Sequence, residues 1–179
     1  MKTNRILMLA AGCALLGGAV MAEDVIQDFE GFGSTPALMQ AVSHIKAGSE
    51  VELEFDTGMD EGNSMNLALS TAKDTWYTQV EFDVTPVSLF DVDSVVIYLK
   101  LLPDSSNENL DIQLKDKHGS TIAKGKKIGT QSISRDSFMA YTIDTSNVKN
   151  ELARISFNVA CADGGTANLA VDNISIIRK

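Results

Sequence analysis

The chain has 179 residues, and its 15 Lys and Arg residues stand against 24 Asp and Glu residues, which gives a formal net charge of −9 at pH 7. This acidic balance argues against nucleic acid as a partner, because phosphate backbones are bound through Lys and Arg. It also argues against docking on an anionic membrane surface, which attracts basic segments.

The first residues have the pattern of an export signal. Lys2 and Arg5 are followed by an apolar stretch that ends at Val20, and Ala22 comes just before an acidic pair. The pattern predicts a signal peptide over residues 1–22, since the stretch is too short and too rich in glycine for a good membrane anchor, which is the alternative interpretation. We therefore expect a bacterial protein exported to the periplasm or beyond, with no transmembrane segment in the mature chain.

A lipid anchor is a second interpretation of the same segment. Ala10-Ala11-Gly12-Cys13 resembles the lipobox of bacterial lipoproteins, although Ala replaces the usual Leu and the apolar run before it is very short. Cleavage after Ala22 is favoured over lipidation of Cys13. It leaves residues 23–179 with 13 basic and 24 acidic residues, a formal charge of −11, and a length that fits one domain.

The mature chain alternates apolar and polar residues with the period of a β-strand. The best helix candidate is Thr35–Lys46, and its apolar spacing is irregular. Strand-like runs occupy residues 50–55, 64–70, 79–84, 95–101, 110–115, 138–143, 155–161 and 169–176. Turn residues separate them, for example Asp116-Lys117-His118-Gly119. Many short strands without helices between them predict an all-β fold, an antiparallel jelly-roll β-sandwich.

Catalytic patterns are missing from the sequence. It has no GxSxG, HExxH or CxxC motif, and its two histidines, His44 and His118, are far apart. Glu50, Glu52 and Glu54 fall on one face of one strand, where like charges are normally solvated. We therefore expect a protein that binds rather than catalyses. A small glycoside hydrolase is the least favoured alternative.

Acidic residues mark both ends of the mature chain. Asp28-Phe29-Glu30 follows the signal segment, and Asp172 comes shortly before the C-terminus. If the terminal strands pair antiparallel, Glu30 and Asp172 come close together, and two such carboxylates favour a Ca²⁺ ion between them. The loop of residues 58–64 could supply further oxygens. The alternative is that Asp172 belongs to a turn and that Glu30 is solvated.

Several motifs in this order resemble one family. The D-F-E start is followed by Gly62-Asn63-Ser64 opening an alternating strand, Trp76 opening another, and the two strands at 90–100 and 110–116; Val171-Asp172-Asn173-Ile174 closes the chain. The order is similar to that of galactose-binding-like jelly rolls of carbohydrate-binding modules, especially family 11 and its relatives, over nearly all of residues 23–179. The resemblance implies a structural calcium with Glu30 and Asp172 as ligands and Asn63 or Ser64 as a further ligand.

The resemblance also implies a polysaccharide or oligosaccharide ligand on the concave sheet. We expect Trp76, Tyr98 and Gln113 to contact it, because sugar rings pack on aromatic faces, with Asp111 and Lys115 as polar partners. Trp76 and Tyr77 are expected on opposite faces of their strand. Aromatic residues are few, and Phe138 stands where the relatives usually carry Trp. The rival interpretation is a structural or adaptor protein of the cell envelope that binds another protein through the sandwich, since no catalytic domain is attached.

Overall fold

The computed structural model describes residues 23–71, 76–160 and 165–179. The predicted signal peptide and Cys13 lie outside the described residues. The helical segments are α1 (Thr35–Met39) and two 3₁₀ turns (Met59–Glu61 and Thr130–Ser132). The strands are β1 (Glu23–Gln27), β2 (Val42–Ile45), β3 (Glu50–Glu54), β4 (Ser64–Ser70), β5 (Thr78–Ser88), β6 (Val92–Leu101), β7 (Asn109–Lys115), β8 (Thr121–Lys124), β9 (Ile128–Gly129), β10 (Met139–Asp144), β11 (Glu151–Ala160) and β12 (Thr166–Arg178).

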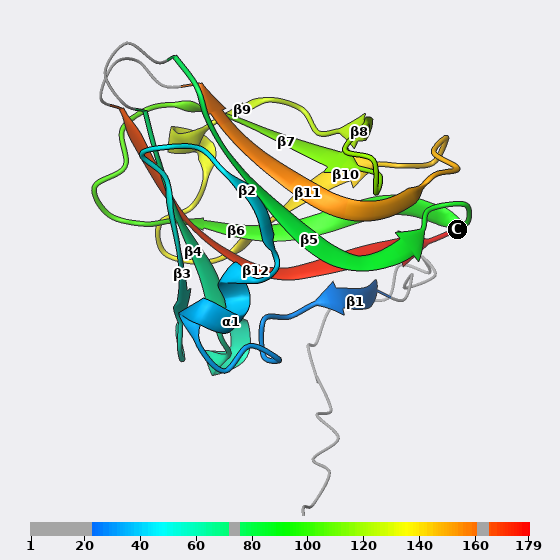
Figure 1. Cartoon of the computed structure of the whole chain (residues 1–179), viewed down its shortest axis with the longest axis horizontal. Helices are drawn as coiled ribbons and strands as arrows, with labels where there is room; N and C mark the ends of the chain where they lie inside the picture. The colour runs from blue at the N-terminus through cyan, green and yellow to red at the C-terminus, as the bar shows by residue number, and fades with distance from the viewer. Residues whose placement is uncertain (1–22, 72–75, 161–164) are drawn as a thin grey trace, which may run out of the picture.

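The strands form two antiparallel sheets that stack on each other (Figure 1). Sheet A has the order β10-β6-β12-β4-β3, and β1 also pairs with β12. Sheet B has the order β2-β5-β11-β7-β8, and β9 also pairs with β7. The predicted all-β antiparallel sandwich is confirmed. No helix among the described residues is long and apolar enough to cross a bilayer.

The core lies between the two sheets and is built by the apolar half of each alternating strand. Along β7, and over most of β5 and β11, every second side chain is a buried core residue, as in Phe82, Phe157 and Ile112. Sheet A contributes residues such as Leu67 and Ile97 from the other side. Because side chains of a strand alternate between its faces, the residues between these core positions point outward. The core therefore decides which side chains form the two outer surfaces.

The segment from Thr35 to Lys46, expected as the best helix candidate, is helical only in its first half. Ser34 caps α1 by accepting a hydrogen bond from the Ala37 N–H, and Pro36 stands in the first turn, where it needs no hydrogen-bond partner. The helix ends at Met39, and the chain then pairs with β5 as β2. The β-branched residues Val42 and Ile45 fit this strand, so long-range pairing overrides the weak helical pattern.

Phe29 anchors the N-terminal segment in the core. Its ring is fully buried, and its centroid lies 5.5 Å from that of Phe82. The backbone of Phe29 has a φ of 63°, a left-handed conformation that a bulky residue rarely adopts and that the packing of the ring holds in place. Glu30 follows on the surface. The burial of Phe29 thus positions Glu30 beside the loop before β4.

Candidate functional site

The outer face of sheet B carries a regular array of polar side chains. The strands β5, β11 and β7 lie side by side, with β11 in the middle, and each contributes its outward residues. Asn158 lies opposite both Gln79 and Asp111 in the register. The next two cross-strand rows are Glu81-Ser156-Gln113 and Asp83-Arg154-Lys115. Three neighbouring strands therefore build one continuous polar surface.

Glu81 is the centre of an ion-pair cluster on this surface. Its carboxylate pairs with Lys115 and lies 3.1 Å from Nη1 of Arg154, whose Nε lies 2.6 Å from the Asp83 carboxylate. The Glu81 side chain is only 9% exposed. Burial alone would raise the pKa of Glu81, but the hydrogen bonds and charges of Lys115 and Arg154 outweigh it and lower the pKa below its ordinary value. The cluster is thus charged and internally neutralised.

Amide side chains cover the rest of the surface. Gln113 Nε2 donates to Oδ2 of Asp111 at 2.7 Å, and Thr121 donates to Oε1 of Gln113 at 3.0 Å. Asn158 Nδ2 donates to the Asp111 carbonyl oxygen at 3.1 Å. Amides and a carboxylate that are held by neighbours can exchange hydrogen bonds with a hydroxyl-rich ligand without first being reordered.

A groove of about 240 Å³ opens at one end of this surface, beside the residues that precede β5. Trp76 borders it and is 74% exposed, which is unusual for a residue of this size. Its ring centroid lies 4.9 Å from that of Tyr77, and Nζ of Lys46 lies 3.3 Å from the centroid of Tyr77. The rest of the lining is polar at Asn109, Asp111, Gln113, Lys127 and Asn158 and apolar at Val159 and Ala160. The groove combines an aromatic wall with hydrogen-bonding groups.

Four of the five predicted ligand contacts lie on this side of the molecule. Trp76, Asp111 and Gln113 line the groove together, and Lys115 lies farther along the same face in the ion-pair cluster. Tyr98 does not join them. It points outward, as its alternation with Ile97 and Leu99 predicts, but β6 belongs to sheet A. The expected grouping is corrected for Tyr98, since alternation gives the face of a strand and does not give its sheet.

Tyr98 lies on the opposite surface. Its hydroxyl donates to Oε2 of Glu23 at 3.3 Å, and burial, with the nearby Glu23 carboxylate, raises the pKa of Tyr98. A small hollow there also involves Ser175, whose buried hydroxyl has no hydrogen-bond partner among the described residues. Tyr98 therefore belongs to a separate environment.

Several groove residues were not predicted. Asn158 could have been predicted, because residues 155–161 alternate and Asn158 therefore points to the face of β11 away from the buried Phe157. Tyr77 was expected on the face opposite Trp76, but both rings line the groove, because β5 begins only at Thr78 and alternation does not apply before it. Lys127 precedes the short strand β9, and no local pattern marks it.

The acidic residues near the two ends of the described chain meet at the edge of sheet A. The predicted antiparallel pairing of the terminal strands is confirmed, with Val25 opposite Ser175. Asp172 Oδ2 accepts a hydrogen bond from the Met59 N–H at 2.6 Å, and Glu30 Oε1 accepts one from the Asn63 N–H at 2.5 Å. Burial raises the pKa of Asp172, and the charges of Glu30 and Asp28 add to the increase despite the two backbone hydrogen bonds.

The oxygen atoms around this hollow decide whether a calcium ion fits there. Glu30 and Asp172 line one hollow, and a Cβ added to Gly58 would lie 2.8 Å from Oδ2 of Asp172 and 2.6 Å from the Asn63 carbonyl oxygen. These oxygens are of the type that Ca²⁺ prefers. No three carboxylate, imidazole or thiolate groups converge among the described residues, so carbonyl oxygens would have to complete the set. The Ser64 hydroxyl hydrogen-bonds Thr57 and Asn66 instead.

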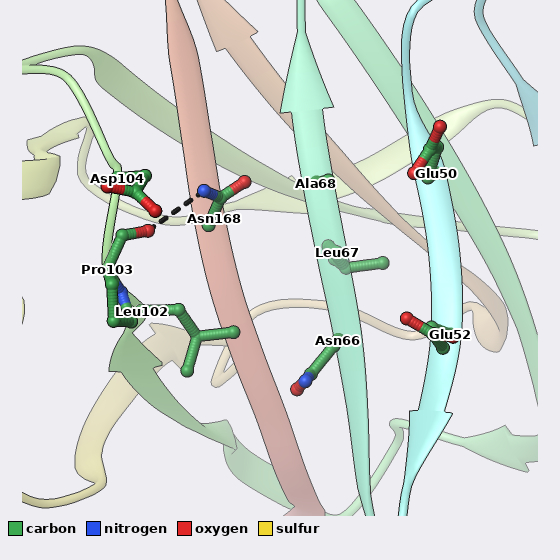
Figure 2. Close-up of a pocket in the computed structure, with 9 residues that line it drawn as sticks. All are labelled: Glu50, Glu52, Asn66, Leu67, Ala68, Leu102, Pro103, Asp104 and Asn168. Carbon is green, nitrogen blue, oxygen red and sulfur yellow. Dashed lines mark hydrogen bonds between the residues drawn. The ribbon is translucent and has the colours of Figure 1, made fainter.

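A second groove, of about 270 Å³, lies on the outer face of sheet A (Figure 2). Glu50 and Glu52 of β3 border one side of it, as expected for a solvated acidic strand face. Asn168 of β12 borders the other side and donates to the Pro103 carbonyl oxygen at 2.9 Å, next to Asp104. This groove is acidic and has no aromatic side chain in its lining. It lacks the apolar ring face that the groove at Trp76 provides.

Sequence comparisons do not place the chain in a family: no family model matches it, and no curated protein matches it. Solved structures do resemble it. A family 11 carbohydrate-binding module from Clostridium thermocellum, in complex with a β-1,3-1,4-mixed-linked tetrasaccharide, has a TM-score of 0.59 at 16% identity over 89% of this chain and 98% of that chain. A xylan-binding domain from Paenibacillus barcinonensis has a TM-score of 0.50 at 17% identity over 89% and 97%.

An exo-β-agarase has a TM-score of 0.62 at 16% identity and covers 87% of this chain, which matches 25% of the enzyme's length. At these identities the similarity concerns the fold, and function has to be argued from the site. The predicted resemblance is confirmed at that level: the chain has the jelly-roll β-sandwich fold of carbohydrate-binding modules.

Proposed function

We infer that the protein is an exported, non-catalytic carbohydrate-binding module whose ligand lies on the outer face of sheet B. The observation that carries this proposal is the exposed Trp76 at the end of a surface of ordered amides and carboxylates. A sugar has an apolar face of C–H groups and a rim of hydroxyls, so an aromatic ring packs on the first and polar side chains bind the second. Asp111, Gln113 and Asn158 are suited to the second role.

The rival proposal, an adaptor that binds an envelope protein, gains no support from the described surface. Among the described residues, the exposed large apolar side chains come from separate elements and loops: Val25, Met39, Ile45, Phe55, Trp76 and Phe90. Protein interfaces normally present a contiguous apolar centre. A protein partner that co-purifies while no glycan binds would nevertheless favour the adaptor.

The test is retention on glycans with a matched pair of variants. We predict that the wild-type protein is retarded in affinity gels containing its glycan and that Trp76→Ala weakens binding about tenfold or more, because a central aromatic contact is worth more than about 1.4 kcal/mol. Phe90→Ala is the control, because Phe90 is another exposed aromatic residue, 58% exposed, in the loop between β5 and β6.

Equal retention of Trp76→Ala and wild type would contradict the proposed site. No retention on a broad panel of soluble and insoluble glycans would contradict the proposed function.

A structural calcium ion at Glu30 and Asp172 is part of the proposal. It would neutralise two carboxylates that now repel each other across a partly buried hollow. We predict that the melting temperature rises with Ca²⁺ and falls with a chelator, by about 5 °C at a Ca²⁺ concentration one hundred times Kd. Asp172→Asn should lose this response. Asp104→Asn, which changes an exposed acid in the loop between β6 and β7, should keep it. An unchanged melting temperature of the wild type would rule out the ion.

A further inference from the structure

The charge around the Trp76 groove differs from that of the whole chain. The protein carries a net charge of −9, yet the acids Glu81 and Asp83 on this face are paired with Lys115 and Arg154. The groove lining holds one ammonium group, that of Lys127, and one carboxylate, that of Asp111. Two further lysines of the described residues stand near it, Lys46 over the ring of Tyr77 and Lys124 opposite Gln113 in the register. These four described side chains together carry a net positive charge.

Lys127 is the lysine of this group that lines the groove itself. It lines the groove with Trp76 and Gln113, its residue is exposed, and it forms no ion pair or side-chain hydrogen bond with any described residue. Lys124 is opposite Gln113 in the register of β7 and β8, so it stands on the same face and is also exposed. An exposed ammonium group gains little binding free energy when a neutral hydroxyl replaces water as its hydrogen-bond partner. An anionic partner adds a charge-assisted hydrogen bond and is therefore more favourable.

The groove on the outer face of sheet A has a different charge. The groove on sheet A is lined by Glu50, Glu52 and Asp104 and has no basic residue in its lining (Figure 2). The linings of the two grooves thus differ in charge, and the aromatic wall stands in the groove that holds a lysine. A sugar chain that bears carboxylates would be attracted to Lys127 in one groove and repelled by the carboxylates that line the other.

We propose that the ligand of the Trp76 groove is an acidic glycan, with a uronic-acid carboxylate placed against Lys127. This inference rests on the proposed carbohydrate-binding function and names the class of sugar. Asp111 lies in the same groove and accepts a hydrogen bond from Gln113. Its repulsion keeps the ligand carboxylate on the side of Lys127 and Lys124, which orients the sugar ring in the groove.

The experiment compares each acidic oligosaccharide with its own methyl ester, because esterification removes the charge and keeps the sugar rings. Oligogalacturonate, oligomannuronate and a glucuronic-acid-bearing xylo-oligosaccharide serve as the probes, and Kd is measured by calorimetry at low and high salt. We expect one of the acids to bind about threefold to fivefold more tightly than its ester at low salt. The difference should shrink at high salt, since exposed charges are screened.

Two variants locate the effect. Lys127→Gln should remove the difference between acid and ester, and Lys126→Gln, an exposed neighbour outside the groove lining, should keep it. Equal binding of acid and ester by the wild type, or a preference for the ester, would overturn the inference and leave the proposed function standing. Binding of neither form, with no retention on neutral glycans, would overturn both.

Discussion

Tyr141 holds the segment that carries Lys127 at the edge of the sandwich. The Tyr141 hydroxyl donates to the carbonyl oxygen of Lys126 at 2.8 Å. Burial, with the nearby charge of Asp111, raises the pKa of Tyr141 to about 12, so the hydroxyl stays protonated and remains a donor. A Cβ on Gly125 would overlap this hydroxyl, which explains why the residue beside it has no side chain. One hydrogen bond from β10 of sheet A thus fixes a segment that borders sheet B.

We predict that Tyr141→Phe lowers the free energy of unfolding by about 1 kcal/mol, because the Lys126 carbonyl loses its donor. Urea denaturation would measure the change. Tyr98→Phe is the control, since its hydroxyl makes only a 3.3 Å bond to the exposed Glu23 and should matter less. Equal stability of Tyr141→Phe and wild type would show that this hydrogen bond does not hold the segment.

At the scale of elements, three adjacent strands of sheet B share one charged cluster. Glu81 comes from β5, Arg154 from β11 and Lys115 from β7. The pKa of Glu81 is lowered in the folded protein, so its carboxylate stabilises the fold above the unfolded pKa, near the ordinary value of 4.5. This stabilisation is lost as the pH falls below that value through the folded pKa.

Glu81→Gln should therefore cost about 1–3 kcal/mol at pH 7, because it leaves two partly buried cations without their shared anion. The gap to wild type should narrow as the pH falls below about 4.5. Thermal unfolding across pH 3–7 would measure it. Glu50→Gln changes an exposed acid of β3 that forms no ion pair with the described residues, and it should stay within about 0.5 kcal/mol of wild type at every pH. A gap that is constant with pH would contradict the role assigned to the Glu81 charge.

Alternation along the sequence was enough to predict most strands and the outward direction of Asp111, Gln113, Lys115 and Tyr98. It could not separate Tyr98 from the other three, because the sheet of a strand depends on pairing between distant segments. The same long-range pairing turned residues 42–45 from a possible helix into β2. The complete lining of the groove could not be predicted either. Tyr77 and Lys127 lie just before β5 and β9, and local periodicity does not apply outside strands.

At the scale of the whole molecule, charge and aromatic exposure are distributed unequally over the two faces of the sandwich. Sheet A presents the acidic groove of β3 and β12 and the carboxylates Glu30 and Asp172 near its edge. Sheet B presents neutralised ion pairs, Trp76 and Lys127, which has no ion pair with any described residue. A jelly roll has two open sheet faces, so this asymmetry indicates which face is suited to a ligand and which is suited to solvent and cations.

Glycan binding at Trp76 can be probed directly, because Trp76 is the only tryptophan of the chain. Tryptophan emission should be recorded while the wild-type protein is titrated with a glycan that retains it. We predict a saturable change in emission with the same Kd as calorimetry, because the sugar would displace water from the Trp76 ring, which is 74% exposed. A glycan that binds by calorimetry and leaves the emission unchanged would show that the ligand does not lie against Trp76.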